Sequence, residues 1–317
     1  MAKRKVAVIS LFLCFCLFVT PQMAKAASTT EAKEPIDPGK NCSLTLHFQH
    51  EKALFSDLAV KLYRVAKVSE DFQYTITSSF ASSGLSLNGI KTGGEWNVIQ
   101  STLESHILLQ GILPDLATKT DSQGNAFFEN LSPGLYLAVA DPIVKDGYSF
   151  SFQSTLISLP GLSQEGLWGY EVTAKVKIDY LPPLEPDEKN ERKVVKLWKD
   201  GGKKTRPEKV EVEIFRNGSS FKTVTLSEEN NWSYSWPVEK DGTKWQVAEK
   251  NVPSGYQATI EEKEDAFILT NTHKNHRPGN APQTGDSSNI LLYVVLMILS
   301  GSVLIFLGIP GKRKGEK

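Results

Sequence analysis

The chain has 317 residues, which is long enough for two domains of ordinary size. Lys and Arg together number 36, as do Asp and Glu, so the formal net charge at pH 7 is zero. This balance lacks the basic excess of nucleic-acid-binding proteins, and we expect no nucleic-acid partner.

The amino terminus has the three parts of a secretory signal peptide. Basic residues at positions 3–5 precede an apolar stretch over residues 6–19, and Ala24-Lys25-Ala26 follows. Small residues in this spacing predict removal of residues 1–26 by cleavage after Ala26. Residues 27–40 are small, charged and Pro-containing, and we expect them to form a flexible leader.

The cysteine content shows whether the exported protein can form a disulfide bond. Cys14 and Cys16 lie inside the predicted signal peptide, so only Cys42 remains in the mature chain. One thiol cannot form an intramolecular disulfide. The sequence assigns no role to Cys42.

Residues 41–180 are expected to form the first domain. Alternating or apolar segments predict strands at 43–50, 58–66, 126–128, 134–140, 151–159 and 170–178. Trp96, Ile99, Leu103 and Ile107 recur at helical spacing and predict one inserted helix, which Leu113-Pro114 should end. A Ser-rich stretch at residues 78–83 is expected to be loop.

Residues 120–141 carry a resemblance as well as a turn. Asp121 to Gly124 has turn composition and lacks the run of carboxylates that calcium requires, so we expect no metal there. The stretch TDSQGNAFFENLSPGLYL resembles the amino-terminal domains of Gram-positive pilins. The resemblance implies a β-sandwich with helical insertions between strands.

A Pro-rich linker at residues 181–190 separates this domain from a second one at residues 191–274. The second domain shows seven short β-rich segments, at 193–198, 209–215, 221–226, 232–236, 244–249, 256–261 and 266–271. Such spacing predicts an immunoglobulin-like β-sandwich. The predicted fold class is therefore all-β, with two sandwiches in tandem and a helix inserted in the first.

Three polar residues share a strand face with apolar neighbours. Lys196 alternates in phase with Val194 and Trp198, Glu249 with Trp245 and Val247, and Asn271 with Phe267 and Leu269. If the apolar members point inward, the amine, carboxyl and amide do too, which is unfavourable unless they satisfy one another. The competing interpretation places Lys196 on the surface beside Glu249 and Asn271 in a turn.

A buried Lys–Glu pair can exist as a neutral amine and a protonated acid, because desolvation shifts both pKa values toward the uncharged forms. The Lys196 amine could then attack the Asn271 side-chain carbonyl while Glu249 shuttles protons and ammonia leaves. The product would be an isopeptide bond between the first and last strands of the domain.

Four segments support that chemistry by resemblance: VVKLW (194–198), EENNWSYSW (228–236), QVAEKNVPSGY (246–256) and ILTNT (268–272). They look like the B-type repeat domains of collagen adhesins and pilins, in which matching Lys and Asn residues crosslink autocatalytically. The resemblance gives Lys196 and Asn271 as partners and Glu249 as the catalytic acid. In the first domain, His47 and His50 stand where such domains often place Lys, and no matching Glu or Asn follows, so no bond is expected there.

The carboxyl terminus has the layout of a cell-wall sorting signal. The pentapeptide Ala281-Pro282-Gln283-Thr284-Gly285, within residues 275–289, precedes an apolar run at 290–309 and a basic tail at 310–317. Twenty such residues can span a bilayer as a helix, with the tail inside. The pentapeptide resembles the LPxTG signal of Gram-positive surface proteins, except that Ala281 replaces Leu. The resemblance implies that a sortase cleaves the Thr284–Gly285 bond and attaches Thr284 to peptidoglycan or to another pilin.

We therefore predict a wall-anchored subunit of a sortase-assembled pilus, near its base because the spacer from His273 to Asn280 is short. Lys177 resembles the acceptor lysine in the Tyr-Pro-Lys motif of backbone pilins, except that Val176 replaces the Pro, and Lys175 and Lys189 are competitors. The alternative is a monomeric adhesin that binds host matrix through the first domain. No motif of a conventional enzyme, metal site or cofactor site is present in the sequence.

Overall fold

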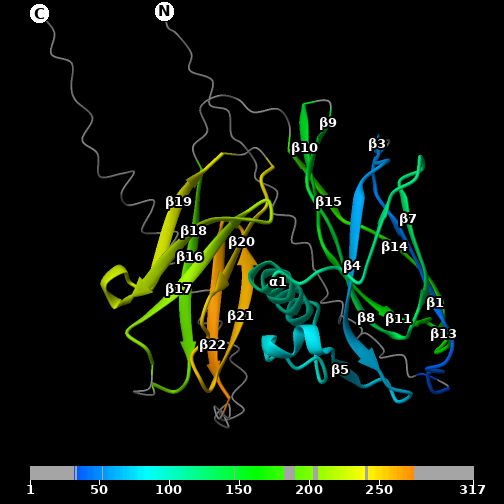
Figure 1. The fold of residues 1–317 in the computed structure, drawn as a ribbon, viewed down its shortest axis with the longest axis horizontal. Helices are drawn as coiled ribbons and strands as arrows, with labels where there is room; N and C mark the ends of the chain where they lie inside the picture. The colour runs from blue at the N-terminus through cyan, green and yellow to red at the C-terminus, as the bar shows by residue number, and fades with distance from the viewer. Residues whose placement is uncertain are drawn as a thin grey trace, which may run out of the picture. The chain divides into compact units, whose positions relative to one another are not determined.

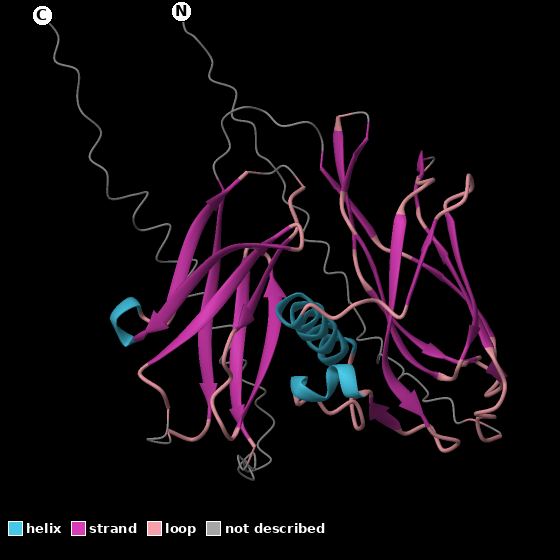
Figure 2. Ribbon diagram, in the orientation of Figure 1, coloured by secondary structure: helices cyan, strands magenta, loops and turns pink. Residues whose placement is uncertain are grey.

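A computed structural model of the chain describes residues 32, 34–51, 53–145, 147–181, 190–202, 206–239 and 242–274. The described residues belong to one compact unit. That unit contains two β-sandwiches and little helix (Figures 1 and 2), so the predicted all-β class is confirmed. The signal peptide, the linker proline run and the sorting signal with its apolar span lie outside the described residues.

The first sandwich is built from two main sheets. One has the order β14 (Glu171–Lys175), β1 (Cys42–His47), β7 (Asn125–Leu131). The other has the order β11 (Thr155–Leu159), β8 (Gly134–Ala140), β4 (Ala59–Val68), β5 (Tyr74–Ile76), with β6 (Leu116–Lys119) also on β4. A core of buried apolar side chains, among them Leu46, Leu62 and Phe128, fills the space between the sheets.

Three smaller ladders complete the first sandwich. β15 (Ile178–Leu181), β10 (Tyr148–Phe152) and β9 (Ile143–Lys145) form a small sheet. β2 (Gln49–His50) pairs with β3 (Ala53–Leu54), and β12 (Gly161–Leu162) pairs with β13 (Trp168–Gly169). The pairs β2–β3 and β12–β13 were not expected as separate ladders, because two-residue segments carry no readable alternation.

The inserted helix is α1 (Gly93–Gln110), and it lies on the outer face of the β4–β8 sheet (Figure 1). It begins at a capping box in which the Glu95 amide donates to Thr92 Oγ1 and the Thr92 amide donates to Glu95 Oε2. Ile99, Leu103 and Ile107 are buried and Trp96 is partly buried, so the predicted apolar face is confirmed. The helix ends before Gly111, at left-handed φ 61°, earlier than the predicted Leu113-Pro114 stop.

Some sequence predictions for the first sandwich are wrong in detail. The segment 151–159 is two strands, β10 and β11, in different sheets, and 170–178 is likewise divided between β14 and β15. The two changes of sheet occur side by side, because the Gln153 amide donates to the Lys177 carbonyl oxygen at 2.9 Å. The Ser-rich segment is a 3-10 helix, η1 (Ser78–Ser83), whose Phe80 is buried.

The predicted leader extends too far. Ile36 is only 2% exposed and packs into the same core as α1, and its amide donates to the Glu70 carbonyl oxygen at 2.9 Å. Residues 34–40 therefore belong to the first sandwich, because burying an isoleucine offsets the ordering of its neighbours.

The Asp121–Gly124 turn forms as expected. Asp121 Oδ1 accepts hydrogen bonds from the amides of Gln123 and Asn125, both at 2.8 Å. Gly124 has φ +78°, and a Cβ at that position would lie 2.5 Å from the Phe48 carbonyl oxygen. Only glycine fits both the conformation and the space.

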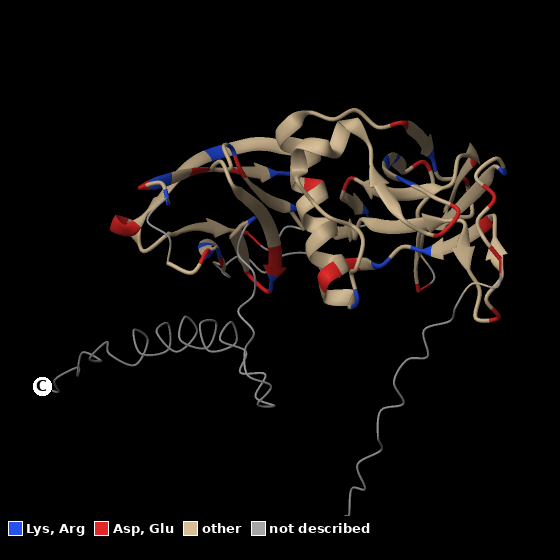
Figure 3. Ribbon diagram, turned by 90° about the horizontal axis from the view of Figure 1, so that it is seen from below, with Lys and Arg blue, Asp and Glu red and all other residues tan. Residues whose placement is uncertain are grey.

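The second sandwich contains the seven expected strands. One sheet has the order β19 (Ser233–Val238), β16 (Asn190–Lys199), β22 (Ala266–His273), β21 (Tyr256–Lys263). The facing sheet has the order β18 (Ser219–Ser227), β17 (Lys209–Arg216), β20 (Trp245–Glu249), and η2 (Glu228–Asn230) is a short 3-10 turn. Acidic and basic residues are interspersed along both sandwiches (Figure 3), in keeping with the zero net charge.

Helix α1 also covers the edge of the second sandwich. β21 is an edge strand, and the amide of its Ile260 donates to Thr102 Oγ1 of α1 at 3.0 Å. Close by, Glu104 Oε2 accepts from Lys244 Nζ at 2.6 Å and from Gln246 Nε2 at 3.0 Å. The helix thus satisfies an edge amide that would otherwise be open to another strand.

Candidate functional site

Lys196 and Asn271 lie on neighbouring strands of one sheet. β16 and β22 pair in parallel, with Lys196 opposite Leu269 and Trp198 opposite Asn271. Because side chains alternate along a strand, residues two apart share a face. The lysine and the asparagine are therefore diagonal neighbours on the inner face of the first and last strands.

Glu249 reaches this pair from the facing sheet, at the end of β20. Its Oε2 lies 3.0 Å from Lys196 Nζ, and its Oε1 accepts a hydrogen bond from Asn271 Nδ2, also at 3.0 Å. One carboxyl group therefore contacts both the amine and the amide across the core.

The three side chains are buried. Lys196 is 3% exposed, Glu249 4% and Asn271 0%, and the apolar core of the sandwich surrounds them. The inward orientation expected from alternation is what the structure shows. The competing interpretation, with Lys196 on the surface and Asn271 in a turn, is wrong because the packing of β16 against β22 turns both side chains inward.

Burial controls the protonation of the pair. It lowers the pKa of Lys196 from 10.5 to about 8, although the nearby Glu249 carboxylate acts in the opposite direction. Burial likewise raises the pKa of Glu249 above 4.5, against the effects of Lys196 and Asn271. Both shifts favour the uncharged forms, so a neutral amine beside a protonated acid becomes an accessible state.

Trp198 forms part of the wall around the amine, with its ring centroid 4.6 Å from Lys196 Nζ. An ammonium over an indole face gains about 1–2 kcal/mol. Removing an ion from water costs several kcal/mol, so desolvation outweighs this attraction. The indole therefore acts mainly as an apolar cover.

The Asn271 carbonyl oxygen is buried and has no hydrogen-bond partner among the described residues. An unpaired buried acceptor costs about 1–3 kcal/mol, and such groups are concentrated at functional sites. Rotation of the amide about its final torsion, which is soft and roughly two-fold, would bring this oxygen to Glu249. A protonated Glu249 can then donate to the carbonyl and increase its electrophilicity while the Lys196 amine attacks.

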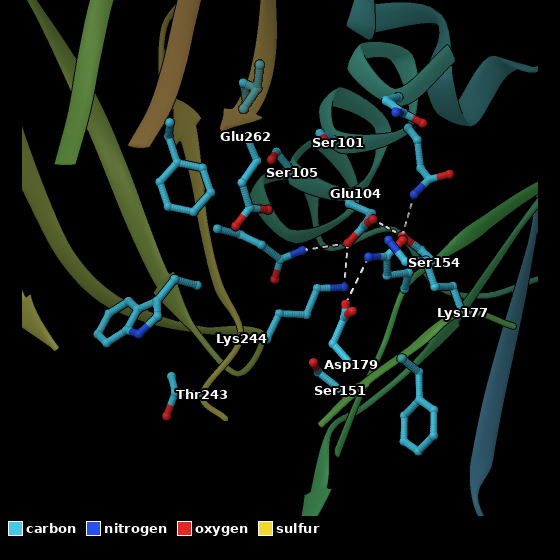
Figure 4. Close-up of a pocket in the computed structure, with 18 of the residues that line it drawn as sticks. Ser101, Glu104, Ser105, Ser151, Ser154, Lys177, Asp179, Thr243, Lys244 and Glu262 are labelled. Atoms are coloured by element: carbon cyan, nitrogen blue, oxygen red, sulfur yellow. Dashed lines mark hydrogen bonds and ion pairs between the residues drawn. The ribbon is translucent and has the colours of Figure 1, made fainter. Parts of the chain in front are cut away.

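The structure also shows where the candidate acceptor lysines lie. Lys177 follows β14 and is exposed, and it lines a cavity of about 570 Å³ beside α1, β10 and β15 (Figure 4). Lys175 is exposed and lies opposite His47 in the β1–β14 ladder. Lys189, Ala26 and Ala281–Gly285 lie outside the described residues.

Cys42 is buried in the core of the first sandwich, 2% exposed. Burial raises the pKa of its thiol to about 11. The thiolate is the reactive form of cysteine, so this residue behaves as a small apolar side chain.

Sequence reasoning missed one polar cluster near the site. Asp200, immediately after β16, is 1% exposed, and its carboxylate accepts hydrogen bonds from Arg206 and Tyr256. Hydrogen bonds from Arg206 keep the pKa of this carboxyl well below its usual range. Asp200-Gly201-Gly202 has the composition of a simple turn, so only the unusual burial of the aspartate indicates a further role.

A family model matches the second sandwich. Residues 192–272 match the model of the Cna protein B-type domain, so this part of the chain is similar to such domains. The match spans the second sandwich and leaves the first unassigned. No curated protein matches the chain.

Solved structures give weaker likenesses. A single B repeat unit of the collagen-binding surface protein Cna of Staphylococcus aureus is 16% identical, covering 74% of this chain and 98% of its own, with a TM-score of 0.25. The full-length major pilin SpaD of Corynebacterium diphtheriae is 12% identical, with coverages of 76% and 99% and a TM-score of 0.27. The minor pilin GBS52 of Streptococcus agalactiae is 15% identical, with coverages of 76% and 99% and a TM-score of 0.23. With TM-scores this low, none of these likenesses establishes a common architecture over the whole chain.

Proposed function

We propose that the protein is a structural subunit of a cell-wall-anchored, sortase-assembled pilus, stabilised by an autocatalytic bond between Lys196 and Asn271. The observation that supports this proposal best is the buried contact of both residues with Glu249. Burying a lone amine, acid and amide is unfavourable, and the reaction replaces the amine and the primary amide with one uncharged secondary amide.

The proposed reaction balances as a transamidation. Neutral Lys196 Nζ attacks Asn271 Cγ, and Glu249 donates its proton to the carbonyl oxygen. Glu249 then takes a proton from the attached nitrogen and delivers it to the leaving amide nitrogen. As that nitrogen departs as ammonia, the hydroxyl formed at the carbonyl oxygen returns its proton to Glu249 and the carbonyl is restored. The Nζ–Cγ amide forms, the Cγ–Nδ2 bond breaks and Glu249 ends protonated as it began.

The intact mass of residues 27–280, which contain the compact unit, tests this bond. The proposal predicts a mass about 17 Da below that of the unmodified chain, because one ammonia is lost. Glu249→Ala should restore the full mass, since the proton carrier is removed. A wild-type chain of full mass, or an unchanged loss in Glu249→Ala, would contradict the proposal.

Surface attachment would follow from the sorting signal. A sortase would break the Thr284–Gly285 bond and join the Thr284 carbonyl to an amine, of peptidoglycan or of another subunit, while Gly285 leaves with the precursor's span. The precursor would cross the membrane through residues 290–309. Among the described residues, no helix has the length and apolar character of a membrane span.

A position at the pilus base is supported by the short spacer. The eight residues from His273 to Asn280 reach at most about 3.5 Å each, so the second sandwich would stay close to its attachment point. Lys177 is the proposed acceptor for an incoming subunit, because it is exposed at the edge of a cavity.

The second candidate function is a wall-anchored monomeric adhesin that binds host matrix through the first sandwich, and the polar cavity beside α1 favours it. Wall digestion of the producing cells discriminates the two. A ladder of high-mass species containing this chain, reduced by Lys177→Ala, supports the pilus subunit. A single wall-linked monomer, unchanged by the substitution, supports the adhesin.

A further inference from the structure

Asp200 ties the end of the first strand of the second sandwich to the start of β21. Its carboxylate accepts hydrogen bonds from Nε and Nη2 of Arg206, from the Tyr256 hydroxyl at 3.0 Å and from the Gly202 amide at 3.0 Å. The bidentate, charge-assisted bonds to a guanidinium are among the strong ones in proteins. We call Asp200, Arg206 and Tyr256 the Asp200 clamp.

The clamp contacts one side of the Trp198 indole. The Tyr256 ring meets it edge to face, with centroids 5.2 Å apart and planes at 78°, and the Arg206 guanidinium carbon lies 5.8 Å from its centroid. On another side, Trp232 packs against the same indole at 5.4 Å and 81°. Trp198 is thus enclosed by groups that fix the position and tilt of its ring.

The same indole lies over the Lys196 amine, at 4.6 Å from Nζ. None of the clamp residues has a contact with Lys196, Glu249 or Asn271 among the hydrogen bonds and ion pairs of the described residues. Trp198 contacts both the clamp and the amine, so it can carry an effect of the clamp to Lys196.

We propose that Asp200, Arg206 and Tyr256 are positioning residues for formation of the Lys196–Asn271 bond, because they hold the Trp198 ring over the amine and keep water from it. This inference rests on the proposed crosslink and adds a determinant of its rate. Loosening the clamp would let the indole move and water reach Nζ.

Water at the amine would change the protonation of the reacting pair. Solvation favours the ammonium–carboxylate form over the neutral amine–acid form that reacts. Both forms hold the same number of protons, so the ratio between them does not depend on pH. The reaction rate should therefore fall only at low pH, where both groups are protonated (the acid limb), and at high pH, where both are deprotonated (the alkaline limb). Among the described residues, the charged or titratable groups that contact the clamp are Glu228, near Arg206, and His273, whose ring meets Tyr256 edge to face.

Loosening the clamp should therefore have two effects together. The maximum rate should fall, because fewer molecules hold the neutral pair. The alkaline limb should move to higher pH, because a better-solvated Lys196 has a pKa closer to 10.5 than the value of about 8 in the intact site. Simple loss of stability would lower the yield of folded protein without moving that limb.

The experiment follows the reaction from the unfolded chain. Residues 27–280 would be collected in guanidinium. Only chain of full mass, in which no bond has formed, would be used, and it would be refolded by dilution at a series of pH values. Samples quenched at intervals would be analysed by intact mass. Asp200→Asn should slow ammonia loss about tenfold, because a rise of one unit in the pKa of Lys196 lowers the fraction of neutral amine about tenfold. It should also shift the alkaline limb of the pH–rate profile to higher pH.

Tyr256→Phe provides a milder variant that keeps the ring against Trp198 and removes only the hydroxyl. It should shift the profile in the same direction by a smaller amount, and it decides the question if Asp200→Asn does not refold. Tyr234→Phe is the matched control. The Tyr234 hydroxyl accepts a hydrogen bond from Lys222 Nζ at 2.7 Å and has no part in the clamp. The profile of this control variant should equal the wild-type profile.

Three results would overturn the inference. Clamp variants that fold and crosslink with the wild-type profile would show that Trp198 needs no clamp. A slower reaction with an unmoved alkaline limb would show a merely structural role. A wild-type chain that never loses ammonia would overturn the proposed function together with this inference, whereas the first two results leave the crosslink intact.

Discussion

In both sandwiches an early strand pairs in parallel with a late strand, but the side chains on the inner faces of the two pairs differ. β1 lies parallel to β14 in the first sandwich, and β16 lies parallel to β22 in the second. The inner face of β1 carries Leu44 and Leu46, whereas the inner face of β16 carries Lys196, next to Asn271 of β22. One pairing depends on apolar burial, and the other contains reactive groups.

This difference predicts different responses to stress. An apolar contact between strands opens and closes reversibly, and its strength follows the buried area. An amide between Lys196 and Asn271 would hold the strands together after the surrounding packing has melted. If the proposed sorting motif anchors the chain, tension from the wall would enter at β22, the strand that carries one end of the proposed crosslink.

The largest expected effect is the loss of the crosslink in Asn271→Ala. The bond closes a loop of about 75 residues, and the chain-entropy model gives about 4 kcal/mol for a link of that span. In a domain of this size, that corresponds to a drop of roughly 20 °C in the melting temperature of the second sandwich. Calorimetry of the wild type and variant measures it, and equal melting temperatures would show that no link closes the loop.

A second variant tests the apolar closure of the first sandwich. Leu46 is 0% exposed on β1, so Leu46→Ala should cost about 3 kcal/mol through lost burial and the cavity that remains. The melting transition of the first sandwich should fall while the mass loss in the second persists. Loss of the crosslink in this variant would show that bond formation in the second sandwich depends on the packing of the first.

The pH dependence of stability should separate free and crosslinked lysine. In Asn271→Ala the pKa of Lys196 is lowered from 10.5 to about 8, so between these values the unfolded chain binds a proton that the folded chain lacks. The free energy of unfolding should therefore rise with pH in this window, by about 3 kcal/mol. A crosslinked wild type would have an amide instead, so its urea titrations should show no such additional rise. Identical slopes for wild type and variant would contradict this prediction.

The smallest expected effect concerns the contact between α1 and the second sandwich. Glu104→Gln keeps a hydrogen-bonding group near Gln246 and Ser154 but removes the ion pair with Lys244. The pair is mostly buried, with side-chain exposures of 10% and 22%, so we expect a loss of about 1 kcal/mol in urea unfolding. A loss of several kcal/mol would mean that this contact, rather than the crosslink, dominates stability.

Much of the fold and the centre of the site could be predicted from the sequence because their signals are local. Alternation over a few residues placed Lys196, Glu249 and Asn271 on inner faces, and spacing of three to four residues placed Ile99 and Leu103 on one helix face. Both depend only on the geometry of a single strand or helix.

The features that were missed depend on contacts between distant segments. Gln153 and Lys177 mark changes of sheet that no local pattern encodes, because either continuous segment fits one long strand. Asp200 and Tyr256 meet only after β16 and β21 take their places in the sheet. Ile36 is buried by α1 and its neighbours, although its own segment has the composition of a leader.

The central claim is a covalent bond between Lys196 and Asn271, and peptide mapping by tandem mass spectrometry tests it most directly. A protease digest of the wild-type chain should contain one branched peptide that joins the segment of Lys196 to that of Asn271, about 17 Da lighter than the sum of the two. Two separate linear peptides of full mass, with both residues unmodified, would contradict the account.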